Sequence, residues 1–273
     1  MATKLGIIAG GGTLPLRLLE KCRETKRPFY LIGLKGQIDE SLFADYEYPT
    51  LRIGAAGQAI DLLKENNVIE IVMAGHVKRP NLASLRPDAT VLKVLLKTGA
   101  MALGDDGLLT AVIKYLEDEE GFKIVSVDSI LGADELASGN LGLIAPDEKS
   151  QKDILRGIEV LKIMGPADVG QAVVVQDEMI LALEAVEGTA ALLERCKNLK
   201  REARGGVLVK IRKPGQETRI DMPTIGPDTV NQAIDAGLLG IAIDAGGMII
   251  LDKDDTIKAA NKAGLFIHAL DID

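Results

Sequence analysis

A run of three glycines close to the N-terminus has the residue types of an anion-binding turn. Gly10, Gly11 and Gly12 follow an apolar strand-like segment and precede a segment that predicts an amphipathic helix over 13–25. Free backbone N–H groups and the positive end of a helix favour an anion, and phosphate is the obvious one. The alternative, a tight turn that needs positive φ, accounts for one of the three glycines. We therefore expect the glycines and the adjacent Leu14 to contact a phosphate-bearing substrate.

The glycine run departs from the standard nucleotide motifs. The dinucleotide fingerprint G-x-G-x-x-G needs a third glycine where this sequence has Pro15, and an acid that the following strand segment FYLIGLKG lacks. The Walker pattern G-x-x-x-x-G-K-[ST] is absent from the sequence. These departures argue against an oxidoreductase with a nucleotide cofactor, which the first strand–helix–strand unit would otherwise suggest.

A basic turn, AGHVKRP, follows the predicted buried strand IEIVMA. Ligands of open α/β sheets bind beyond the carboxyl ends of the strands, which makes Gly75, His76, Lys78 and Arg79 candidates for substrate binding. A solvated surface turn explains the same residues equally well. His76 by itself is weak evidence, because a lone histidine is more often a structural hydrogen-bond partner.

Two adjacent carboxylates, Asp105 and Asp106, follow Gly104 at the start of a predicted helix. One of them is explained as an N-cap, while the pair also suits Mg²⁺, directly or through water. The sequence contains only two cysteines and two histidines. Any catalytic metal is therefore held mainly by oxygen, which favours magnesium or manganese over zinc.

In the second half of the chain, the segment EAVEGT repeats the order of strand, glycine, hydroxyl and helix. Glu187, Gly188 and Thr189 are thus a second candidate anion site. The alternative is that Thr189 acts only as the N-cap of the following helix, and this stretch by itself favours that alternative.

The segment KIRKPGQETRIDMPTIGPDTV, residues 210–230, is the most informative. Pro227 suits the first position of a helix, so the preceding DMPTIG lies against a helix N-terminus. A bound anion would repel the Asp221 carboxylate unless this carboxylate binds a metal ion or an incoming water molecule. Exposed loop charge is the alternative. Positive charge is added nearby by Arg212, Lys213 and Arg219.

The segment 87–104 carries Lys93 and Lys97 with one early acid, in a chain whose net charge is −8. Its apolar residues predict a buried helix. The alternative is a stretch that touches a membrane surface or lines an acyl-chain groove, with the lysines kept at its edge.

The elements that position these residues alternate between strand and helix, which predicts two α/β domains. Residues 1–134 are expected to form a Rossmann-like, doubly wound parallel sheet whose last strand is 122–131, and residues 135–273 a mixed α/β domain with a linker in 132–150. The predicted elements of the second domain are helix 147–164, a strand pair in 171–185 that turns near 176–178, helix 189–199, strand 206–211, helix 228–236 and strands in 240–251.

Composition limits the class of protein. A net charge of −8 disfavours nucleic-acid binding, which normally shows a basic face. No stretch approaches the roughly 18 apolar residues of a membrane-spanning helix, and the N-terminus does not resemble a signal peptide. Cys22 and Cys196 belong to no CxxC pair, which fits a reducing compartment. We expect a cytoplasmic protein.

In their order along the chain, LGIIAGGGTLP, AGHVKRP, GDDGLL, DVGQAVVV, EAVEGT and KPGQETRIDMPTIGPDTV resemble the LpxI-type UDP-2,3-diacylglucosamine pyrophosphatases of lipid A biosynthesis. The resemblance spans almost the entire chain. The stretch QETRxDxPTIG, residues 216–226, is its most specific part. His76 stands where asparagine is often expected in that family, which puts a role for this side chain in doubt.

The resemblance implies a Mg²⁺-dependent hydrolase that releases UMP and 2,3-diacylglucosamine 1-phosphate (lipid X), with water attacking the β phosphorus and the lipid held between the domains. It implies that Asp221 is essential, binding either the metal together with Asp105 and Asp106 or the attacking water. Gln171, Gln216 and Thr224 join the expected substrate-binding residues, together with Lys213.

The resemblance also implies a protein peripheral to the inner membrane of a Gram-negative bacterium, and it leaves a homodimer open. A non-catalytic protein that binds a nucleotide sugar or a lipid remains the rival interpretation. Such a protein binds the same ligand and releases no UMP.

Overall fold

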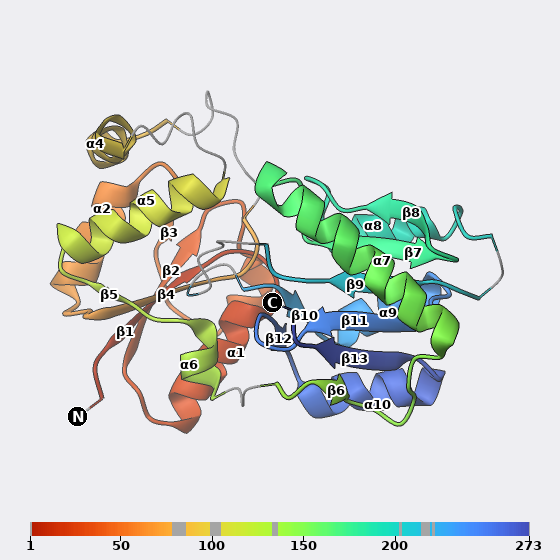
Figure 1. The fold of residues 1–273 in the computed structure, drawn as a ribbon. Coiled ribbons are helices and arrows are strands. Elements are labelled where there is room, and N and C mark those ends of the chain that lie inside the picture. Colours follow the sequence, from red (N-terminus) through yellow and green to blue (C-terminus); the bar gives the residue numbers. More distant parts are fainter. Residues whose placement is uncertain are drawn as a thin grey trace. The chain divides into compact units, whose positions relative to one another are not determined.

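The computed structural model describes residues 2–77, 86–98, 105–132, 136–201, 204–213, 219 and 222–272 (Figure 1). The chain forms two compact units. Unit 1 comprises Met1–Ala133 with Glu217–Asp221, and unit 2 comprises Asp134–Gln216 with Met222–Asp273. Among the described residues, no helix has both the length and the apolar character needed to cross a bilayer.

Unit 1 is built on a five-stranded sheet in the order β3-β2-β1-β4-β5, in which every pair is parallel. Strand order reverses between β1 and β4, as it does in doubly wound folds. The structure confirms the predicted Rossmann-like parallel sheet. Its strands are β1 (Leu5–Ala9), β2 (Phe29–Leu34), β3 (Thr50–Leu51), β4 (Glu70–Ala74) and β5 (Lys123–Ile124).

Helices cover both faces of this sheet (Figure 1). On one face, Leu63 of α2 and Ile113 of α5 pack with Ile71 of β4 in one apolar cluster. On the other face, α1 packs against α6. The helical elements of unit 1 are α1 (Leu14–Glu24), η1 (Glu40–Phe43), α2 (Ala56–Glu65), α4 (Ala89–Thr98), α5 (Asp105–Asp118) and α6 (Val127–Leu131).

Two sequence predictions in unit 1 are wrong in part. The predicted strand 122–131 pairs with β4 over Lys123–Ile124 only, and Val127–Leu131 is the helix α6. Gly132 ends α6 in the left-handed conformation that glycine tolerates, with its N–H bonded to Asp128 O at 2.9 Å. The predicted helix within 87–104 exists as α4, but only one of its faces is buried.

Unit 2 contains a six-stranded sheet in the order β6-β13-β11-β9-β7-β8. Strands β9, β11 and β13 are parallel, while β6 and β7 run antiparallel to them and β8 runs antiparallel to β7. The predicted mixed α/β domain is confirmed. The strands are β6 (Gly139–Asn140), β7 (Ala172–Gln176), β8 (Met179–Leu183), β9 (Val207–Lys210), β11 (Gly240–Asp244) and β13 (Phe266–Leu270), with β10 (Thr224–Ile225) and β12 (Ile249–Ile250) forming a separate parallel pair.

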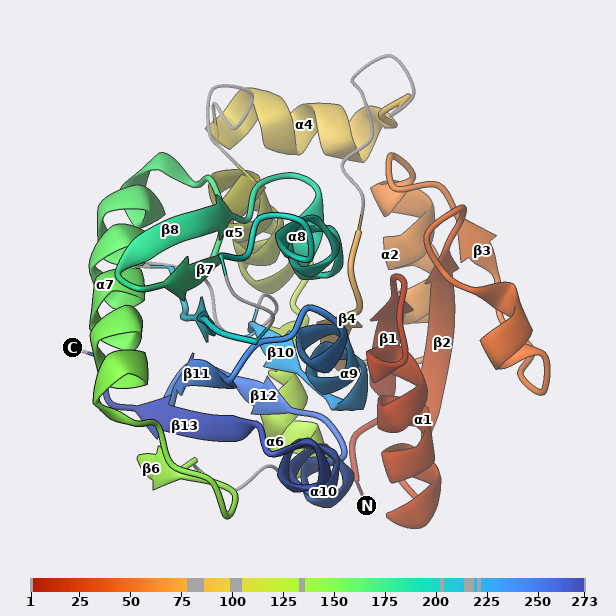
Figure 2. The ribbon, with the colours of Figure 1, turned by 90° about the vertical axis from the view of Figure 1, so that its right-hand side faces the viewer.

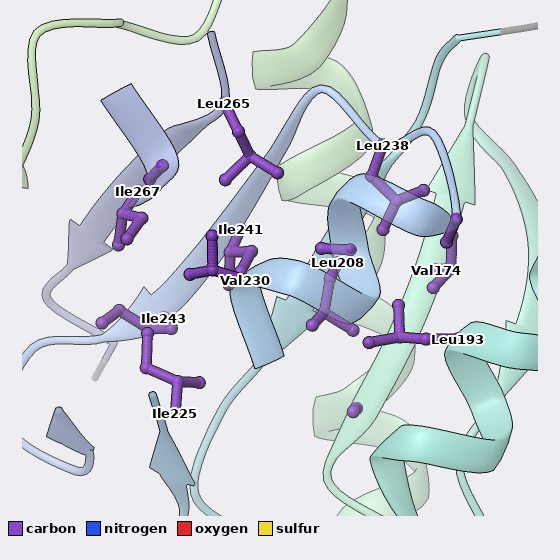
Figure 3. Close-up of a cluster of buried hydrophobic side chains, with 14 of the residues drawn as sticks. Val174, Leu193, Leu208, Ile225, Val230, Leu238, Ile241, Ile243, Leu265 and Ile267 are labelled. Atoms are coloured by element: carbon purple, nitrogen blue, oxygen red, sulfur yellow. The ribbon is translucent and has the colours of Figure 1, made fainter. Parts of the chain in front are cut away.

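Alternation along the strands divides the apolar side chains of unit 2 between two layers. Val207 and Val209 pack with Ile154 of α7, whereas Leu208 packs with Val230 of α9 in the opposite layer (Figure 3). Accordingly α7 lies on one side of the sheet and α8, α9 and α10 on the other (Figure 2). The helical elements are α7 (Glu148–Met164), η3 (Gly165–Ala167), α8 (Gly188–Cys196), α9 (Pro227–Asp235) and α10 (Lys253–Ala263).

The predicted start of a helix at Pro227 is confirmed, with Gly226 as its N-cap. The predicted strand pair in 171–185 is also confirmed. It turns at Asp177 and Glu178, both with positive φ, as type I′ hairpin turns require. The Asp153 carboxylate of α7 accepts the Glu178 N–H at 2.6 Å and so holds this turn against the helix.

A carboxylate on β4 makes the stability of unit 1 depend on pH. Glu70 accepts hydrogen bonds from Thr3 and from Lys123, the latter at 2.9 Å, and is paired with Arg27. The hydrogen bonds from Thr3 and Lys123, followed by the charges of Lys123 and Arg27, lower the pKa of Glu70 and outweigh its desolvation. A lowered pKa in the folded state stabilises the protein above the unfolded pKa, and this stability is lost as pH falls through the folded pKa.

We therefore expect Glu70→Gln to destabilise the protein at pH 7 by about 1–3 kcal/mol. The difference from the wild type should shrink as pH falls below about 4.3, the unperturbed pKa of glutamate. Urea unfolding at several pH values measures it, with the exposed Glu65→Gln as control. A difference that stays constant between pH 7 and pH 3 would contradict the assignment.

Candidate functional site

The three glycines of unit 1 lie where the strand order reverses, at the carboxyl ends of β1 and β4. Gly11 and His76 exchange two backbone hydrogen bonds, from Gly11 N to His76 O at 2.8 Å and from His76 N to Gly11 O at 3.0 Å. The structure thus brings together the GGG turn and the AGH turn that the sequence singled out separately. This is the position where doubly wound folds bind their ligands.

Each of these glycines has a structural reason, which is either close approach of neighbouring atoms or a positive φ. A Cβ on Gly10 would lie 2.6 Å from His76 O, and one on Gly75 2.4 Å from Gly11 O. A Cβ on Gly11 would lie 2.5 Å from the His76 ring. Gly12 has a φ of +86°, which a side chain rarely adopts. The predicted tight turn with positive φ thus accounts for one glycine of the run, Gly12, while close packing against His76 accounts for Gly10 and Gly11.

An anion site at this turn remains compatible with the geometry. Gly12 is exposed, and α1 begins at Leu14, with no hydrogen bond from the Thr13 side chain to cap it. The His76 ring lies over the turn, since its Nδ1 would be 3.5 Å from a Cβ on Gly12. A histidine ring beside a helix N-terminus adds a hydrogen-bond donor to the same exposed surface.

The side chains of several predicted site residues are outside the described part of the structure. Asp105 and Asp106 belong to the first turn of α5 rather than to its N-cap, and their side chains are outside the described part of the structure. Five others lie outside the described residues altogether: Lys78, Arg79, Gly104, Gln216 and Asp221.

In unit 2, a buried lysine joins two of the predicted segments. Lys210 is the last residue of β9 and is 6% exposed. Its Nζ donates to Thr189 Oγ1 at 3.1 Å and to Thr224 O at 3.0 Å. One ammonium group therefore ties the first turn of α8 to β10, and so the EGT segment to the PTIG segment.

A buried carboxylate continues this network. Glu184 follows β8 and is 7% exposed. It accepts a hydrogen bond from Thr189 Oγ1 at 2.6 Å and another from Gln171 N at 3.0 Å. Buried charges are tolerated when opposite charge and hydrogen bonds compensate them, and Thr189 links the two charges here. We call Lys210, Thr189 and Glu184 the buried network.

The preference for Thr189 as a simple N-cap is wrong. The N-cap residue of α8 is Glu187, and the Thr189 hydroxyl is used between Lys210 and Glu184. The Glu187 carboxylate is paired with Arg195 at 2.9 Å. Gly188, with a φ of +80°, allows the chain to turn into α8 at this point.

Gln171 carries an unsatisfied polar atom beside the buried network. Its backbone N–H bonds to Glu184 and its carbonyl accepts the Ile211 N–H at 3.0 Å. Its side-chain Oε1 is buried without a hydrogen-bond partner among the described residues. Leaving a buried acceptor unpaired costs about 1–3 kcal/mol, so a donor group on a ligand would be favoured at this position.

Two further ion pairs involve residues that end β11 or follow β9. Asp244 is buried at the end of β11, accepts the Gly246 N–H at 3.2 Å and lies 3.8 Å from Arg212 Nε. Burial raises the pKa of Asp244, and Arg212 opposes that rise. Lys213, predicted to bind substrate, is paired with Asp168.

Sequence reasoning missed Lys210, Glu184 and Asp244. Each is the first charged residue after a run of apolar strand residues: VLV before Lys210, MILAL before Glu184 and GIAI before Asp244. That pattern was the available signal, because an ionisable residue continuing a buried strand needs a partner or a ligand. Within the described part of the chain, no three His, Cys, Asp or Glu side chains are grouped so as to hold a metal ion.

Comparisons with known proteins match both units. The sequence model of the LpxI N-terminal domain matches residues 4–133, and that of the LpxI C-terminal domain matches residues 137–268. The chain is 39% identical over 275 aligned residues to a Caulobacter vibrioides protein named UDP-2,3-diacylglucosamine pyrophosphatase LpxI. The alignment covers 98% of each chain.

Proposed function

Because the chain belongs to the LpxI family, we propose that it hydrolyses the diphosphate of UDP-2,3-diacylglucosamine to UMP and 2,3-diacylglucosamine 1-phosphate. The name of its Caulobacter relative supports this substrate. The observation that carries the proposal in the structure is the buried network, in which one ammonium group contacts two predicted site residues, Thr189 and Thr224, from two separate segments.

The reaction requires positive charge near the phosphate oxygens and an aligned water. The oxygen of that water forms a bond to the β phosphorus while the bond from this phosphorus to the bridging oxygen breaks, and the bridging oxygen leaves with UMP. We assign the alignment of the water, or the binding of a metal, to Asp221. Lys210 adds positive potential at the carboxyl end of β9.

We further propose Mg²⁺ as the cofactor. The donor set would come from Asp221, Asp105 and Asp106, and carboxylate oxygens are the ligands that Mg²⁺ prefers. When bound, the ion would neutralise charge on the phosphate oxygens. We place the reaction at the cytoplasmic face of the inner membrane, because the substrate carries two acyl chains.

Product analysis tests the proposed function. Purified protein incubated with UDP-2,3-diacylglucosamine and Mg²⁺ should release UMP and lipid X in equal amounts, measured by chromatography. Excess EDTA should abolish release, and added Mg²⁺ should restore it. Binding of the substrate without UMP release would support the rival interpretation of a binding protein. Undiminished turnover in EDTA would overturn the metal but leave the hydrolase.

A further inference from the structure

Helix α4 of unit 1 presents an apolar ridge to solvent. Leu92 is 47% exposed and Leu96 is 81% exposed. Residues four apart lie on the same face of a helix, so the two side chains are neighbours. The opposite face is anchored, because buried Val94 and the partly buried Leu95 pack against Ala111 and Tyr115 of α5. The ridge therefore faces solvent on a helix that is held in place.

Positive charge flanks the ridge. The sequence of α4 contains Lys93 and Lys97 and no acid. Both lysine side chains are more than half exposed and share one carboxylate, Glu119, with Lys93 at 2.9 Å. The acid that precedes the helix, Asp88, accepts the N–H groups of Gly57 and Val91. The exposed face of α4 thus combines aliphatic side chains with one net positive charge, two lysines against Glu119, in a chain whose net charge is −8.

We propose that the exposed face of α4, Leu92 and Leu96 with Lys93 and Lys97, docks on the surface of a membrane that contains anionic lipid. Aliphatic residues beside lysines on one helix are the pattern of helices that lie in the membrane interface. The proposal rests on the proposed function in one respect: a substrate with two acyl chains must be taken from a bilayer, and among the described residues no helix crosses one.

Charge and spacing distinguish this surface from the exposed aliphatic residues of α7. On α7 of unit 2, Leu155 is 65% exposed and Ile163 is 69% exposed. They are eight residues apart, and Arg156 and Glu159 form an ion pair between them. That surface is interrupted and carries both signs of charge. It offers a matched control, because two exposed aliphatic side chains can be removed there as well.

Vesicle sedimentation without substrate tests the proposal. The full-length protein should bind vesicles of phosphatidylethanolamine and phosphatidylglycerol and bind neutral phosphatidylcholine vesicles at least tenfold more weakly. The variant Leu92→Gln/Leu96→Gln should bind the anionic vesicles at least tenfold more weakly than the wild type. Leu155→Gln/Ile163→Gln should bind as the wild type does. An unchanged circular dichroism spectrum establishes that each variant is folded.

Two outcomes would overturn the proposal. In the first, the α4 variant binds anionic vesicles as tightly as the wild type. In the second, size-exclusion chromatography shows that the wild type is a dimer and the α4 variant a monomer, so the ridge is a contact between copies of this chain. Release of UMP from detergent-dispersed substrate distinguishes a failure of the docking proposal from a failure of the proposed function. It should be equal in the wild type and the α4 variant, since the detergent supplies the lipid without a bilayer.

Discussion

Replacing Lys210 by methionine is expected to lower turnover at least 100-fold and to destabilise unit 2. Methionine is of similar length but cannot donate to Thr189 or Thr224, so two segments with predicted site residues lose their common partner. The substitution also removes the positive charge that is linked to the buried Glu184 through Thr189, and hydrogen bonds to charged groups typically contribute about 1.5–3 kcal/mol. Product release and urea unfolding measure the two effects.

A double variant separates the effect on turnover from the effect on stability. Lys210→Met/Glu184→Gln removes both charges, so it should recover part of the lost stability while its turnover stays low. Lys210→Arg keeps the positive charge and should retain more turnover than Lys210→Met. If the double variant regains turnover in step with stability, the role of Lys210 is structural only and its proposed contribution of positive potential to the reaction is wrong.

The second large effect is expected at Asp221. Replacing it by asparagine keeps the size of the side chain and removes the negative charge needed to bind a metal or to accept a proton from water. Losing such a group typically lowers the rate by about 10²–10⁴-fold. Turnover of Asp221→Asn should fall by this amount with little change in melting temperature. Asp228→Asn, an exposed acid in the first turn of α9, is the matched control and should turn over as the wild type does.

Magnesium titration of the Asp221→Asn variant distinguishes the two roles assigned to Asp221. If the residual activity needs a higher Mg²⁺ concentration than the wild type, Asp221 binds the metal. An unchanged Mg²⁺ requirement indicates that it acts on the water. Wild-type turnover in Asp221→Asn would show that neither role holds.

Local patterns predicted the elements of the site better than its contacts. Strand and helix alternation located β1, α1, β2 and the β7–β8 hairpin, because burial imposes a period on the sequence. Short elements were harder to predict, since VSVDSIL has the composition of a strand but its last five residues form the helix α6. The strand β13 and the helix α10 were missed, although both complete the unit 2 sheet and its helical layer.

The sequence by itself determined the two α/β halves, the glycine turn after β1 and the helix start at Pro227, because strand periodicity, glycine and proline act through neighbouring residues. Only the tertiary structure decided that Gly11 packs against His76, and that Lys210, Thr189 and Glu184 form one buried network. Gly11 and His76 lie far apart along the chain, as do Thr189 and Lys210, and the pairing of β1 with β4 and of β9 with β7 inside the two sheets brings them together. A charged residue at the end of a buried strand predicts that a partner exists, and the fold decides which residue it is.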